Sequence, residues 1–117
     1  MATAATTKMI LDCDTGVDDT MAILYATLHP EIDLLAVGSV WGNVDVPLAT
    51  RNSIHAVEMC GRGDIPVATG AAGPINQRPQ DIAYHVHGRD GQGNRGTGRP
   101  VGPAAQGTAA GQLVRLC

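Results

Sequence analysis

The chain has 117 residues and a formal net charge of −3, which limits it to one small domain. Residues 1–94 carry eleven acidic and five basic side chains, and this acidic balance argues against nucleic acid as a partner. No run approaches the roughly 18 apolar residues of a membrane span, and the N-terminus lacks the apolar core of a secretory signal. Three scattered cysteines without a CxxC pair suit a reducing compartment, so we expect a cytoplasmic protein.

The first elements in chain order are a strand and a helix. The apolar run "KMILDCD", residues 8–14, ends in acids and predicts a buried strand whose carboxyl end is polar. Asp18 and Asp19 then precede a helix over residues 20–29, where they would cap free N–H groups and meet the positive end of the dipole. Pro30 ends this helix. Its large apolar side chains fall on one face: Met21, Leu24, Tyr25 and Leu28.

The following elements repeat this alternation. "DLLAVGSVW", residues 33–41, predicts a second buried strand, residues 47–60 a second helix, and "IPVATG", residues 65–70, a third short strand. The order strand, helix, strand, helix, strand predicts an α/β fold, a Rossmann-like parallel sheet with crossover helices. Residues 95–117 are rich in Gly, Pro and Ala and carry no acid, so we expect a disordered tail there.

The segment "DCDTGVDD", residues 12–19, places four carboxylates in eight positions. Like charges this close repel one another and raise one another's pKa, unless a bound cation compensates them. Asp12 and Asp14 are two apart at a strand end and are expected on one face, and Asp18 and Asp19 reach the same space from the helix. Open α/β sheets bind ligands at this end of their strands, and a hard cation with six to eight oxygen ligands suits the cluster.

Other interpretations of the cluster are a helix cap with surplus surface acids, an EF-hand loop and a phosphatase. The EF-hand is excluded, because position twelve counted from Asp12 is Ile23 instead of Glu. Phosphatases of the haloacid dehalogenase type also begin with a strand that ends in Asp-x-Asp. That family has Thr or Val where this chain has Gly16, and its pattern has no use for the Asp18–Asp19 pair.

The stretch "ILDCDTGVDDTMAIL" resembles the N-terminal signature of the inosine–uridine-preferring nucleoside hydrolases, an apolar strand followed by D-x-D-P-G-x-D-D. Thr15 departs from the usual Pro of that signature. "SVWGNV" resembles the family's Gly-Asn segment at the end of the second strand, "HGRDGQGN" its His-Gly-x-x-Gly loop, and "TRN" at residues 50–52 also fits. The resemblance covers residues 8–94, which we take as the N-terminal part of such a domain.

In that family a calcium ion at the bottom of the pocket holds the attacking water and the ribose diol. The resemblance implies that Asp14 and Asp19 are calcium ligands and that Asp14 is also the general base. It further implies that Asp18 and Asn43 hydrogen-bond ribose hydroxyls and that His87 lies in a loop that closes over the ligand. Asp12 would be a supporting acid near the metal.

The implied reaction is calcium-dependent hydrolysis of the N-glycosidic bond of ribonucleosides of the inosine and uridine type. Family members are more than twice this length, and we expect a truncated, incomplete or weakly active form of an enzyme that is a homo-oligomer at full length. Two alternatives stay open: a non-catalytic fragment that retains metal or ribose binding, and a divergent Asp-x-Asp phosphatase.

Overall fold

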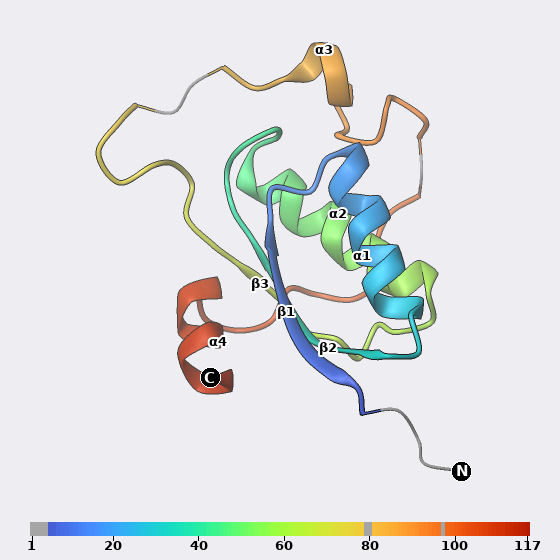
Figure 1. Cartoon of the computed structure of the whole chain (residues 1–117). Helices are drawn as coiled ribbons and strands as arrows, with labels where there is room; N and C mark the ends of the chain where they lie inside the picture. Colours follow the sequence, from blue (N-terminus) through green and yellow to red (C-terminus); the bar gives the residue numbers. More distant parts are fainter. Residues whose placement is uncertain (1–4, 79–80, 97) are drawn as a thin grey trace.

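A parallel three-stranded sheet with the order β1-β2-β3 forms the centre of the protein (Figure 1). The computed structural model describes residues 5–78, 81–96 and 98–117. The strands are β1 (Thr7–Cys13), β2 (Ile32–Ser39) and β3 (Val67–Thr69). In parallel register, Cys13 pairs with Ser39 and Ser39 with Thr69, so the three strands end at the same edge of the sheet. The predicted parallel α/β sheet is confirmed.

The crossover helices are α1 (Val17–Leu28) between β1 and β2, and α2 (Val46–Met59) between β2 and β3. Both lie on one face of the sheet, whereas α4 (Ala109–Leu116) lies on the other, so the fold has three layers (Figure 1). The one-turn helix α3 (Tyr84–His87) lies near the start of α1, beyond the ends of the strands. No helix of the described ranges is both long enough and apolar enough to cross a membrane.

The core lies between the sheet and the α1–α2 layer, and α1 buries a different face from the apolar one seen in the sequence. Its buried residues are Thr20, Ile23 and Ala26. Met21 and Tyr25 are instead about two-thirds exposed (64% and 63%). Small side chains on the inward face let the helix backbone approach the sheet closely, so only one large residue of α1 is fully enclosed.

The C-terminal segment, for which the sequence predicts disorder, folds back along the sheet (Figure 1). The Ala105 N–H donates to the Val67 carbonyl at 2.8 Å, beside strand β3. The side chain of Thr108 then caps α4, and the buried Gln112 Nε2 donates to the Val37 carbonyl at 3.0 Å. The structure differs from the expectation here because these contacts depend on small residues and one amide, which give no apolar periodicity in the sequence. The division of the chain at residue 94 stays a prediction.

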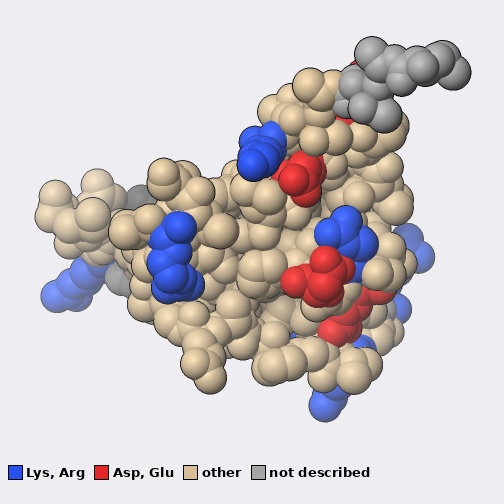
Figure 2. Space-filling model, turned by 90° about the horizontal axis from the view of Figure 1, so that it is seen from below, with Lys and Arg blue, Asp and Glu red and all other residues tan. Residues whose placement is uncertain are grey.

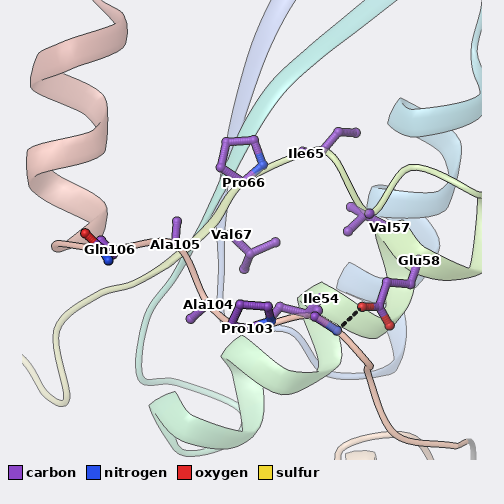
Figure 3. Close-up of a pocket in the computed structure, with 12 residues that line it drawn as sticks. Ile54, Val57, Glu58, Ile65, Pro66, Val67, Pro103, Ala104, Ala105 and Gln106 are labelled. Atoms are coloured by element: carbon purple, nitrogen blue, oxygen red, sulfur yellow. Dashed lines mark hydrogen bonds between the residues drawn. The ribbon is translucent and has the colours of Figure 1, made fainter.

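A hollow of about 380 Å³ lies between the second half of α2 and the C-terminal segment (Figure 3). Its walls include Ile54, Val57 and Pro103, and Ile65 and Pro66 place it at the edge where β3 begins. It is therefore at the opposite end of the sheet from the acidic turn. Figure 2 shows the molecule from that lower end, where acidic and basic side chains lie next to one another.

Candidate active site

Two of the four carboxylates of the acidic turn come together where β1 ends. Asp14 follows the last residue of β1, and Asp19 lies in the first turn of α1. Their carboxyl groups are within hydrogen-bonding reach of each other. The backbone N–H of Asn43 donates to Asp14 Oδ2 at 2.6 Å, and a Cβ on Gly42 would overlap the same carboxyl group. The loop after β2 therefore fixes Asp14 through its backbone.

The two carboxyl groups differ in acidity. Burial raises the pKa of Asp19 to about 6, and the hydrogen bond to Asp14 and the charges of Asp14 and Asp18 act in the same direction. Burial also acts to raise the pKa of Asp14, but hydrogen bonds from Asp19 and from the Asn43 N–H outweigh it and hold this pKa below its usual range. Below about pH 6 the proton of the pair is therefore on Asp19, and Asp14 stays ionised.

The carboxylate pair fits a bound cation. Asp19 Oδ2 is buried and has no hydrogen-bond partner. An unpartnered buried carboxylate oxygen is costly, and a cation bound between Asp14 and Asp19 would satisfy it. Within the described ranges, no cluster of three or more His, Cys, Asp or Glu side chains is placed to hold a metal. The described residues thus offer two carboxylate ligands at this position.

Asp12 does not join this pair. The expectation that Asp12 and Asp14 leave the same face is wrong, because β1 ends at Cys13 and the alternation of side chains stops there. Asp12 is exposed and lines a small hollow with Ala109 and Leu113 of α4, on the other face of the sheet. Asp12 therefore lies apart from the Asp14–Asp19 pair.

His87 is buried and caps helix α1. Its Nδ1 accepts a hydrogen bond from the Val17 N–H at 3.1 Å. A Cβ on Gly16, the N-cap residue, would overlap the imidazole ring, so only glycine fits there.

The helix cap predicted for Asp18 and Asp19 is wrong. Both residues belong to the first helical turn, where their charges still face the positive end of the dipole.

Asp18 and Asn43 lie beside the pair without joining it. The side chain of Asp18 is 74% exposed, and its Oδ1 is 3.8 Å from His87 Nδ1. Asn43 is half-buried and contacts Asp14 through its backbone. The structure therefore gathers all five predicted site residues around the start of α1.

Sequence reasoning missed a set of polar residues beneath the turn. Asn52, on α2, donates to the carbonyls of Thr15 and Asp90, and Gln92 Nε2 donates to Thr20 Oγ1 at 2.7 Å. The sequence does carry one sign of these contacts, since α2 has polar residues on its inward side among apolar ones. Of this set, Asn52 alone belongs to a recognised motif, the "TRN" segment.

Comparisons with known proteins agree with this architecture. The chain is 41% identical over 121 residues to probable uridine nucleosidase 2 of Arabidopsis thaliana, covering 100% of this chain and 38% of that protein. It is 41% identical over 87 residues to the inosine-uridine preferring nucleoside hydrolase of Leishmania major, covering 74% of this chain and 27% of that protein. A solved plant nucleoside hydrolase superposes with a TM-score of 0.87 at 38% identity, over 93% of this chain and 35% of that one.

The family model described as "Inosine-uridine preferring nucleoside hydrolase" matches residues 9–117. This match runs past residue 94, where the motifs recognised in the sequence end, and it includes helix α4. Fold, carboxylate turn and sequence similarity agree, and the chain belongs to the inosine-uridine preferring nucleoside hydrolase family.

Proposed function

We propose that this chain carries the carboxylate part of a site that hydrolyses the N-glycosidic bond of ribonucleosides of the inosine and uridine type, releasing base and ribose. The observation that carries the proposal is the contact between Asp14 and Asp19, with a buried unpartnered oxygen on Asp19, at the ligand-binding end of the sheet. Relatives named as a uridine nucleosidase and an inosine-uridine preferring nucleoside hydrolase support this substrate class. The chain spans 38% of the length of the first of them.

The residues fit a calcium ion, which Asp14 and Asp19 would hold. When bound, such an ion lowers the pKa of a coordinated water and orients it. Calcium takes six to eight oxygen ligands, so two carboxylates leave about four or more positions for other groups. This supports the expectation that the chain by itself is a weak catalyst, because misplacement of about 1 Å can cost a hundredfold in rate.

The chain's own groups have separate roles in this proposal. Asp14, kept ionised by the Asn43 N–H and by Asp19, takes a proton from the attacking water. Asp18, exposed beside the pair, accepts a hydrogen bond from a ribose hydroxyl, and the Asn43 side chain makes a second ribose contact. His87 uses Nδ1 to cap α1, so a contact of this residue with the ligand would be made by Nε2. The nearby carboxylates stabilise the positive charge that develops on the ribosyl group.

The state of the cysteines supports a cytoplasmic location. All three cysteines are unpaired thiols, and burial raises the pKa of Cys13 to about 11. Thiols that stay reduced suit the cytoplasm, where we place the protein.

The deciding experiment combines calorimetric titration with calcium and an assay of free ribose from inosine and uridine. We expect calcium binding that Asp14→Ala and Asp19→Ala each abolish, and slow ribose release that Asp14→Asn reduces by about a hundredfold or more. Asp12→Ala is the matched control, since Asp12 lies on the other face of the sheet. Calcium binding without any turnover would favour the non-catalytic alternative, and hydrolysis of phosphate esters in place of nucleosides would favour a phosphatase.

A further inference from the structure

Asn52 is a buried polar residue that connects three separate parts of the chain. Its side chain is on α2 and the residue is 4% exposed. The amide nitrogen donates to the Thr15 carbonyl at 3.1 Å and to the Asp90 carbonyl at 3.0 Å. A side-chain amide has two N–H donors, so both are used in these contacts. One group thereby joins the carboxylate turn to the loop that contains His87.

The contact with Thr15 acts on the turn itself. Thr15 is fully buried and separates Asp14 from Gly16. Its hydroxyl is also hydrogen-bonded to Ser53 Oγ at 2.6 Å, so two consecutive residues of α2 hold its backbone and its side chain. The position of the Asp14 carboxyl group therefore depends on α2, an element that carries no carboxylate of the pair.

The contact with Asp90 acts on the loop of residues 84–94. The Asp90 carboxylate accepts hydrogen bonds from the backbone of Gln92 and Asn94, at 2.8 Å each, which fixes the shape of the loop. Gly91 has φ +69°, and a Cβ there would meet Asn52 Nδ2 within 2.6 Å, so the loop backbone lies directly against the amide. The same loop also holds the start of α1, because His87 Nδ1 accepts a hydrogen bond from the Val17 N–H.

We propose that Asn52 is a positioning residue that couples the loop of residues 84–94 to the carboxylate turn, so that Asp14 and Asp19 meet in the geometry that binds a cation only while the loop is docked. This inference rests on the proposed function for the identity of the cation. The coupling itself rests on the two hydrogen bonds of Asn52 and on the close approach of Gly91.

The test uses Asn52→Ala in the full chain, with hydrogen exchange of the loop amides and calcium affinity as readouts. We expect exchange of the Gly93 amide, which donates to the His87 carbonyl, to accelerate by about tenfold or more in the folded protein. Calcium affinity should fall by about 10–100-fold, the usual effect of removing an outer partner of a ligand. Thr50→Val is the matched control, because Thr50 is similarly buried on α2 but bonds to Ser39, Thr69 and the Val46 carbonyl, and none of these partners belongs to the carboxylate turn or the loop.

The outcomes separate coupling from a general loss of stability. Loop exchange and calcium affinity that change in Asn52→Ala but stay within about twofold in Thr50→Val support the proposal. Equal effects of the two variants, or an unchanged loop in Asn52→Ala, overturn it. If Asn52→Ala does not fold, Gly91→Ala decides by the same readouts, because its methyl group would overlap Asn52 Nδ2 and the Val44 side chain and push the loop from the amide. If the wild type binds no calcium, the proposed function fails, and loop exchange alone still decides the coupling.

Discussion

Replacing Asp19 by Asn is expected to stabilise the metal-free protein at neutral pH. The raised pKa of Asp19 means that its charged form is disfavoured in the folded state, by burial first and then by Asp14. Asparagine removes that charge but still offers an N–H to the ionised Asp14. A rise in pKa from 3.8 to about 6 corresponds to about 3 kcal/mol of lost stability. Because Asp19 is only half-buried, solvent screening reduces our expectation to about 1–2 kcal/mol.

The pH dependence of this difference follows from proton linkage. Above pH 6 Asp19 is ionised in both the folded and the unfolded state, so the penalty is fully present and the variant has its greatest advantage. Between about pH 6 and 4 the folded wild type binds a proton that the unfolded chain does not, and the penalty disappears. The free energies of unfolding of the two proteins should therefore converge near pH 4.

Urea unfolding in the presence of a chelator, at several pH values from 4 to 7.5, measures this difference. With calcium at about a hundred times its dissociation constant, the wild type should gain about 2.7 kcal/mol and the order of stability should reverse. A variant that is less stable than the wild type at every pH without metal, or a difference that does not change with pH, would refute the reasoning.

Two further predictions concern the surroundings of the pair and the C-terminal segment. Gly42→Ala would make a methyl group overlap the Asp14 carboxyl group and should lower calcium affinity by about tenfold or more. Gly63→Ala is the control, because its Cβ would have ordinary contact distances, and it should leave the affinity unchanged. Equal calcium titration curves for the two variants would contradict this prediction. Gln112→Leu removes one donor to the Val37 carbonyl and should cost about 1 kcal/mol of stability, measured by urea unfolding. A change below about 0.5 kcal/mol would support instead the mobile tail expected from composition.

The sequence by itself determined the alternation of strands and helices and the acidic turn. Continuous apolar runs ending in Asp or Gly indicate buried parallel strands, and the spacing of Asp14 and Asp19 across Gly16 brings them to one strand end. These features are local, because each depends on a few consecutive residues. The boundaries differ by a few residues where the end of an element depends on packing, as at Val17, which begins α1 before the predicted position.

Only the tertiary structure decided which side chains serve the turn. His87 caps a helix that starts 70 residues earlier, and Asn52 reaches carbonyls 37 and 38 residues away. The exclusion of Asp12 from the pair depends on where β1 ends, and the docking of α4 depends on small residues and one buried amide, Gln112. Polar groups of this kind leave no periodic signal in a sequence. Their partners are backbone groups, which every residue carries, so only the folded arrangement of the chain shows which of them are joined.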